Sequence, residues 1–221
     1  MASRKLASIG IALLLGGCMQ ATLEPAPTTA MKPRDKELLA NVPYDNTVAI
    51  AEPFQRHIVD YHRKEAPGTI VIDTDNKFLY FVQANSKAIR YGVTVGEEAQ
   101  GWSGVAKIGN MVEWPSWTPT AGEHERLGPL PNFVPGGPQN PMGARAMYLF
   151  ANGKDTLFRI HGTNQPEYIG SAISSGCIRL TNENVIDLFS RVKIGSPVVV
   201  LAPGAGDSPV SSQTALSDVR T

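Results

Sequence analysis

Residues 158–185 read FRIHGTNQPEYIGSAISSGCIRLTNENV and join a predicted strand to a predicted helix. His161 closes the strand, and Cys177 follows Ser-Ser-Gly, three small residues that allow a tight turn. Successive backbone N–H groups of such a turn can point at one place, as an oxyanion hole requires. A Cys nucleophile needs a nearby base to form a thiolate, and His is the usual one. We therefore interpret Cys177 as a nucleophile and His161 as its base; a buried structural thiol is the alternative that these residues alone leave open.

The second cysteine, Cys18, belongs to a different signal. Residues 1–17 combine Arg and Lys with an apolar run too short to span a bilayer, which is typical of a secretory signal peptide. The run Leu15-Gly16-Gly17-Cys18 predicts a lipobox, whose Cys is acylated and becomes the new N-terminus. An ordinary secretory signal with an incidental Cys is the alternative. If Cys18 carries lipid, Cys177 has no partner for an internal disulfide, because the chain has only 2 Cys.

The composition bounds the class of protein. The 221 residues suffice for one domain with a tail. Lys plus Arg number 20 and Asp plus Glu number 20, so the charge gives no case for nucleic-acid binding. The 21 Gly and 17 Pro suit short strands and turns better than a helical bundle. We interpret His57, His62 and His124 as surface residues, because they share no metal-ligand spacing with one another or with His161. We therefore expect neither a metal nor a cofactor.

Composition also divides the chain. A flexible tether is predicted over residues 18–45, which are rich in Pro, Thr and Ala, and an N-terminal extension of the domain over 46–67. The domain itself is predicted over 68–201. Residues 202–221 are rich in Ser, Gly and Pro and predict a disordered tail.

Within the domain, β-strand signals dominate. Three strands in a meander are predicted over residues 69–96, because two turn signals separate runs of β-branched and aromatic residues. Further strands are expected at 144–150, 157–162 and 197–201. One helix is predicted from an N-cap at Thr181 or Asn182 to Val192, with an apolar face. Residues 101–141 carry few strand signals and are predicted to be a loop. We interpret its three Trp residues together as a substrate wall, whereas packing on the core is the alternative that each single Trp favours: Trp102, Trp114 and Trp117.

The motifs in this chain resemble those of the L,D-transpeptidase catalytic domain (YkuD type). They are His161-Gly162-Thr163, Ile169-Gly170 and the run Ser174-Ser175-Gly176-Cys177-Ile178-Arg179-Leu180, and the resemblance covers about residues 68–201. It implies a mainly β fold, a sandwich or barrel-like arrangement of mixed sheets with one or two short helices.

The resemblance also implies roles for individual residues. The carbonyl of Gly162 would orient His161, and the backbone N–H groups of Ser175, Gly176 and Cys177 would form the oxyanion hole. Some members have His where this chain has Ser175, so no side-chain role is expected there. Arg179 would hold a substrate carboxylate or brace the loop, and a salt bridge to the helix is the alternative. The remaining predicted substrate contacts are Thr163, Trp114 and Trp117.

The implied reaction is acyl transfer on peptidoglycan stem peptides. Cys177 would attack the carbonyl of the third stem residue and expel D-alanine, and an amine of a second stem or of an envelope protein would capture the thioester. Such an enzyme is expected in the periplasm, anchored by lipid at Cys18, and Met19 rather than Asp after that Cys favours the outer membrane over the inner. Capture by carbapenems is also expected. The alternatives are an L,D-carboxypeptidase and a non-catalytic wall-binding lipoprotein; a papain-like endopeptidase is disfavoured because there Cys precedes His.

Overall fold

The computed structural model describes residues 24–26, 30–45, 48–96, 101–173 and 177–206. Within these ranges the chain forms one mixed sheet of 12 strands in the order β1-β2-β5-β4-β3-β12-β7-β8-β9-β11-β6-β10. The strands are β1 (Glu24–Pro25), β2 (His57–Asp60), β3 (Ile70–Asp73), β4 (Phe78–Gln83), β5 (Lys87–Gly92), β6 (Thr94–Gly96), β7 (Gly104–Glu113), β8 (Arg145–Ala151), β9 (Lys154–His161), β10 (Ala172–Ile173), β11 (Ile178–Arg179) and β12 (Pro197–Val200).

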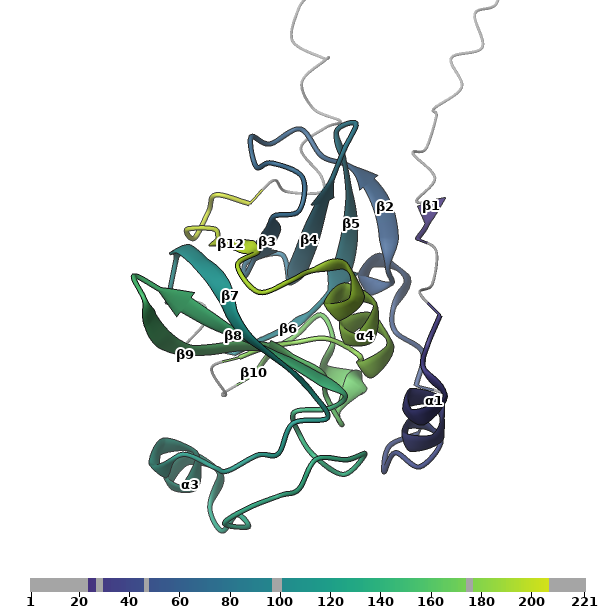
Figure 1. Ribbon diagram of the computed structural model, residues 1–221, viewed down its shortest axis with the longest axis vertical. Coiled ribbons are helices and arrows are strands. Elements are labelled where there is room, and N and C mark those ends of the chain that lie inside the picture. Colours follow the sequence, from purple (N-terminus) through teal and green to yellow (C-terminus); the bar gives the residue numbers. More distant parts are fainter. Residues whose placement is uncertain (1–23, 27–29, 46–47, 97–100, 174–176, 207–221) are drawn as a thin grey trace, which may run out of the picture.

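The predicted meander is present as β3, β4 and β5, each antiparallel to the next. All four residues of β3 are buried, which explains why its first three, Ile70, Val71 and Ile72, form an apolar run. Strand β12 pairs parallel to β3 and antiparallel to β7, so the end of the domain joins the meander to the β7–β9 part of the sheet. Figure 1 shows these two parts running in different directions, with the helix α4 (Asn182–Arg191) beside both.

Three α-helices accompany the sheet in the described residues: α1 (Pro33–Leu39), α3 (Ala121–Leu127) and α4 (Asn182–Arg191). Helix α4 matches the predicted helix, and the Thr181 hydroxyl caps it by accepting from the N–H of Asn184. Its buried face, including Val185 and Leu188, belongs to the same core cluster as side chains of β3, β4, β5 and β8. Two short 3-10 turns, η1 (Glu52–Phe54) and η2 (Pro166–Tyr168), complete the elements. The expected mainly β class is therefore confirmed, with three short α-helices instead of one or two. No helix among the described residues is long and apolar enough to cross a membrane.

The prediction of a flexible tether over residues 18–45 is wrong for much of that range. Strand β1 pairs with β2, and α1 packs on the domain with Asp35 only 2% exposed. Proline at the first turn of α1 suits a helix start, because its missing N–H would be unused there. Residues 30–45 are therefore part of the folded domain.

Three other expectations also need correction. Residues 104–113 form the longest strand, β7, inside the segment expected to be a loop. His57 is 5% exposed in β2 and is not a surface residue. The start of the predicted tail folds back on the domain: the N–H of Gly204 donates to Asp75 Oδ2 at 2.6 Å, and Arg63 Nη1 donates to the Ala205 carbonyl at 2.9 Å.

Candidate active site

Strand pairing brings the two ends of the 158–185 segment together. Strand β11 runs parallel to β9 with Ile178 opposite Ile160 and Arg179 opposite His161. Cys177 immediately precedes β11, so this register places it beside Arg159 and diagonally across from His161. The N–H of Leu180 donates to the His161 carbonyl at 2.9 Å and extends the pairing past the strand.

Side-chain alternation puts the reactive groups on one face of this strand pair. Ile160 is fully buried and Ile178 is 3% exposed, and both belong to the core cluster. Since successive side chains of a strand point to opposite faces, the neighbours of these two residues share the other face. Those neighbours are Arg159 and His161 on β9, and Cys177 and Arg179 on and before β11.

The imidazole of His161 is held in one orientation. Its Nδ1 lies 2.6 Å from the carbonyl oxygen of Gly162, as the family resemblance implies. A carbonyl can only accept, so Nδ1 carries the proton and the lone pair of the neutral ring is at Nε2. Burial and the nearby charge of Arg179 lower the pKa of His161 to about 3, although the backbone carbonyls of Gly162 and Met142 act in the opposite direction. The resting ring is therefore a neutral base at physiological pH.

The thiol of Cys177 is half-buried and free. Burial raises the pKa of this thiol above its ordinary value of 9.0, whereas a backbone hydrogen bond from Arg159 and the charge of Arg179 act to lower it. The resting pair is consequently a neutral thiol and a neutral imidazole. A thiol of this kind becomes a nucleophile when the base removes its proton during attack.

Cys177 opens into a cavity of about 590 Å³. One wall comes from residues around α3, with Trp117 and Glu123, and the other from β8 and β9, with Tyr148 and Arg159. The complete lining is Ser116, Trp117, Thr118, Thr120, Gly122, Glu123, Met142, Tyr148, Thr156, Leu157, Phe158, Arg159 and Cys177. This volume suits a ligand of small-peptide size.

The cavity carries one fixed positive group and one negative group. Arg159 makes two hydrogen bonds to Asp155, at 2.6 and 2.8 Å, and its guanidinium lies 4.3 Å from the centre of the Tyr148 ring. Glu123 belongs to a capping box with Thr120 at the start of α3. Charges of both signs among the lining residues can orient a substrate that itself carries a carboxylate and an ammonium group.

The predicted substrate residues separate into two groups. Trp117 lines the cavity. Trp114 does not: it is 6% exposed in the core cluster, and its Nε1 donates to Asp35 Oδ1 at 2.9 Å. Thr163 is 1% exposed, and its hydroxyl accepts from the N–H of Gln165 at 3.0 Å. Neither Trp114 nor Thr163 lines the cavity, so the prediction that these two residues contact the substrate is wrong.

The other predicted site residues are placed as follows. Arg179 is half-buried beside the Cys–His pair, with Nη1 3.4 Å from Gln165 Oε1, and it is not among the cavity-lining residues. Ser175 and Gly176 of the predicted oxyanion hole, and the predicted lipidation site Cys18, lie outside the described residues. In the described part of the chain, no group of three His, Cys, Asp or Glu side chains could hold a metal ion.

Some residues at the site were missed by reasoning from the sequence. Arg159 lies two positions before His161 in a strand, so period-two alternation could have placed it on the same face. Glu123 and Tyr148 carried no comparable signal, because they reach the cavity only through the packing of α3 and β8. Asn182 was considered only as a helix cap, yet its side chain contacts the segment that follows His161.

The sequence is similar to one family of known proteins. The model of the YkuD L,D-transpeptidase catalytic domain matches residues 67–200. The probable L,D-transpeptidase YbiS of Escherichia coli K12 is 33% identical over 155 residues, which are 66% of this chain and 47% of that protein. The probable L,D-transpeptidase ErfK/SrfK of the same strain is 35% identical over 154 residues, 66% of this chain and 46% of that protein. This chain thus spans about half the length of these curated relatives.

Among solved structures, one described as a probable carnitine operon oxidoreductase from Brucella melitensis is 47% identical, covering 67% of this chain and 94% of that chain. Its TM-score is 0.46. The family model is decisive, because it matches more than half of the 221 residues, including both His161 and Cys177. The chain belongs to the L,D-transpeptidase catalytic-domain family.

Proposed function

We propose that this protein is an L,D-transpeptidase that acts on peptidoglycan tetrapeptide stems. The observation that carries the proposal is the β9–β11 register, which sets Cys177 diagonally across from His161 on one face, with the thiol at a peptide-sized cavity. Family membership supports the reaction class. We also propose a donor, an acceptor and a membrane anchor for this protein. These three parts of the proposal rest on the chemistry of the site and on the sequence.

Acylation begins with the thiol of Cys177 and the imidazole of His161 both neutral. Nε2 of His161 accepts the thiol proton as Sγ of Cys177 attacks the carbonyl carbon of the third stem residue. Backbone N–H groups of Ser175, Gly176 and Cys177 stabilise the resulting oxyanion. When the intermediate collapses, the bond to the terminal D-alanine breaks, and His161 returns the proton to the leaving amine. A thioester on Cys177 and free D-alanine are the products.

Transfer repeats these steps in reverse order. An amine of a second stem, or of an envelope protein, attacks the thioester carbon and gives a proton to His161, which returns it to the departing Sγ. The product is a 3→3 cross-link or a protein joined to peptidoglycan. If water replaces the amine, the same intermediate gives L,D-carboxypeptidase activity, the second candidate function.

The cavity charges support a zwitterionic donor residue such as diaminopimelate. Arg159 lines one wall, fixed by Asp155, and Glu123 lines the other. A carboxylate near Arg159 and an ammonium near Glu123 would hold the third residue on both sides of its reacting carbonyl. Arg179 acts on the pair electrostatically: its charge adds to burial in lowering the pKa of His161, and it opposes the rise that burial causes in the pKa of Cys177.

The test is incubation of the full chain with a purified disaccharide-tetrapeptide, followed by mass spectrometry of the products. Release of D-alanine together with 3→3 dimers is expected, and both should vanish in Cys177→Ala. Release of D-alanine without dimers would assign the carboxypeptidase. Failure to release D-alanine would reject both functions and leave a wall-binding protein.

We further propose that Cys18 carries lipid and holds the domain at the periplasmic face of the outer membrane. The lipobox sequence supports the modification. Since β1 begins at Glu24, five residues separate Cys18 from the fold, and the six Cα–Cα steps across them span at most about 21 Å. Cys18→Ser should release an active, soluble protein; if this variant still fractionates with membranes as the wild type does, the anchor is rejected.

A further inference from the structure

The side chain of Asn182 makes three hydrogen bonds within the protein. It is the first residue of α4 and 1% exposed. Its Oδ1 accepts from the N–H of Ala144 at 2.8 Å, and its Nδ2 donates to the carbonyl of Thr163 at 3.0 Å. Nδ2 also donates to the hydroxyl of Tyr44 at 2.9 Å. One amide thus joins three separate segments of the chain.

Two glycines leave the space for this amide. A Cβ added to Gly143 or to Gly162 would collide with Asn182 Oδ1. A Cβ on Gly162 would also lie 2.9 Å from the backbone N of Ala144. Gly143 has φ +63, a conformation that glycine adopts without strain. The backbone around Gly162 and the Asn182 amide are therefore fitted to each other.

Gly162 is the residue whose carbonyl holds His161. Its own N–H donates to the Arg145 carbonyl at 3.0 Å, and the Thr163 carbonyl that follows it accepts from Asn182. Hydrogen bonds on both sides of the Gly162 carbonyl fix the peptide plane that carries it. The direction of that carbonyl sets which imidazole nitrogen is protonated and where the lone pair of His161 points.

We propose that Asn182 is a positioning residue for the base, and that Tyr44, from the segment after α1, secures it. Asn182 keeps the Gly162 carbonyl aimed at Nδ1 of His161, so that the lone pair that accepts the thiol proton stays at Nε2. This inference rests on the proposed function for its consequence in catalysis. Its effect on the imidazole itself does not depend on any substrate.

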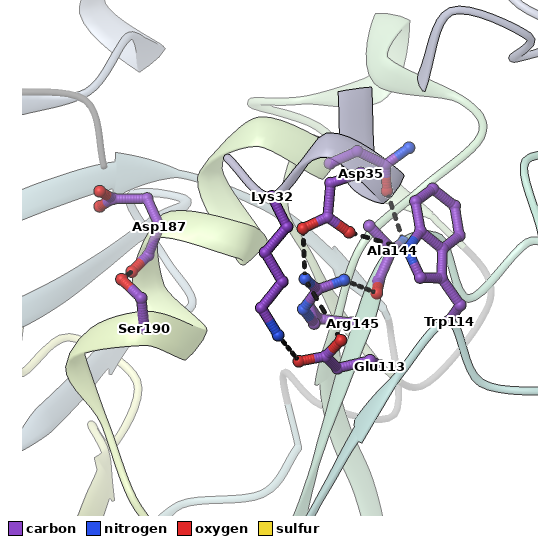
Figure 2. Close-up of polar contacts among 9 residues, drawn as sticks. Lys32, Asp35, Glu113, Trp114, Ala144, Arg145, Asp187 and Ser190 are labelled. Carbon is purple, nitrogen blue, oxygen red and sulfur yellow. Dashed lines mark hydrogen bonds and ion pairs between the residues drawn. The ribbon is translucent and has the colours of Figure 1, made fainter. Parts of the chain in front are cut away.

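Tyr44 reaches Asn182 because the preceding helix is fixed. Within α1, Asp35 Oδ2 accepts from Arg145 Nη2 at 2.7 Å (Figure 2). Arg145 begins β8, the strand that pairs Ala146 with His161. The N-terminal segment therefore contacts the surroundings of the base at two points, Asp35 and Tyr44.

Two variants and one control test the proposal in the full chain. Asn182→Ala removes all three hydrogen bonds, and Tyr44→Phe removes only one. Asn184→Ala is the control, because Asn184 lies in the same first turn of α4 but its side chain contacts Arg56, at 3.4 Å. Two quantities are measured: the rate of Cys177 acylation by the tetrapeptide, and the tautomer of His161 by nitrogen-15 NMR.

We expect the Nδ1–H tautomer of His161 in the wild type and in Asn184→Ala, and a tautomer mixture in Asn182→Ala. Acylation should slow at least about tenfold in Asn182→Ala, since small misplacements of a catalytic group are costly. A loss of roughly threefold is expected in Tyr44→Phe, from one hydrogen bond. Asn184→Ala should acylate at the wild-type rate.

An unchanged tautomer and acylation rate in Asn182→Ala would overturn the proposal, even if the variant melts at a lower temperature. If Asn182→Ala does not fold, Tyr44→Phe decides: wild-type values for both quantities overturn the proposal. If the wild type itself is not acylated, the proposed function fails, and the NMR comparison still decides whether Asn182 positions His161.

Discussion

Replacing Asp35 with Ala tests whether residues 30–45 belong to the folded domain. The Asp35 carboxylate accepts from Arg145 Nη2 at 2.7 Å and from Trp114 Nε1 at 2.9 Å. The side chains of Asp35 and Arg145 are only 2% and 3% exposed. Figure 2 shows the carboxylate between the guanidinium and the indole, with Lys32 and Glu113 at the edge of the same cluster.

The expected loss is large because the partners stay buried. In Asp35→Ala, Arg145 Nη1 still donates a hydrogen bond to the Ala144 carbonyl at 2.7 Å. The nearest remaining carboxylate is that of Glu113, whose Oε2 lies 3.9 Å from Arg145 Nη2. Removing one partner of a buried ion pair costs about 3 to 5 kcal/mol. Taking the lower figure, because Glu113 compensates in part, we expect a loss of about 3 kcal/mol. For a chain of this size that lowers Tm by roughly 6–12 °C.

Thermal unfolding followed by circular dichroism measures the effect. Lys32→Ala is the matched control from the same segment: its pair with Glu113 is 2.6 Å long but the Lys32 side chain is 65% exposed. Such exposed pairs contribute less than about 1 kcal/mol. If Asp35→Ala and Lys32→Ala melt at the same temperature as the wild type, α1 does not stabilise the domain, and the packing of residues 30–45 is refuted.

The remaining predictions concern pH and the site. Burial raises the pKa of Asp35, but hydrogen bonds from Arg145 and Trp114 outweigh it and hold that pKa below the ordinary 3.8. The folded state therefore binds fewer protons, and the difference in unfolding free energy between wild type and Asp35→Ala should persist above pH 3.8 and shrink as the pH falls below it. Because burial keeps the pKa of Cys177 above 9.0, its alkylation by iodoacetamide should still accelerate above pH 9, and a plateau near pH 7 would indicate a preformed thiolate. Gly162→Ala, whose Cβ collides with Asn182, should lose about 1–3 kcal/mol in denaturant unfolding, and an unchanged midpoint would show that the loop has room. A carbapenem should add its mass to the peptide containing Cys177, and an adduct elsewhere would count against this nucleophile.

The sequence predicted the parts of the fold whose signals are local. The meander and α4 follow from apolar periodicity and turn residues, and the Thr181 cap was one of two expected. Strand β7 was missed because Gly109 and Asn110 interrupt its pattern. Tertiary packing explains the glycine: a Cβ at Gly109 would collide with the Phe150 ring. Helix α1 was missed because its seven residues gain stability from contacts with Arg145 and Trp114, which lie far along the chain.

At the site, the sequence predicted two reacting groups but not their surroundings. The roles of His161 and Cys177 stay predictions, and the contact between His161 and the Gly162 carbonyl is present as the resemblance implied. Residue type could not distinguish Trp114, which faces Asp35 in the core, from Trp117, which lines the cavity. That difference depends on which side of the 114–117 segment faces the sheet, and no periodic pattern encodes it.

Intact-mass spectrometry during the first turnover tests the central claim most directly. The full chain is mixed with a disaccharide-tetrapeptide and quenched in acid, which preserves a thioester. We predict a mass increase equal to the donor minus D-alanine, located on the peptide that contains Cys177, slowed in His161→Ala and absent from Cys177→Ala. A wild-type chain that releases D-alanine without any such adduct, or carries the adduct at another residue, would contradict nucleophilic catalysis by Cys177.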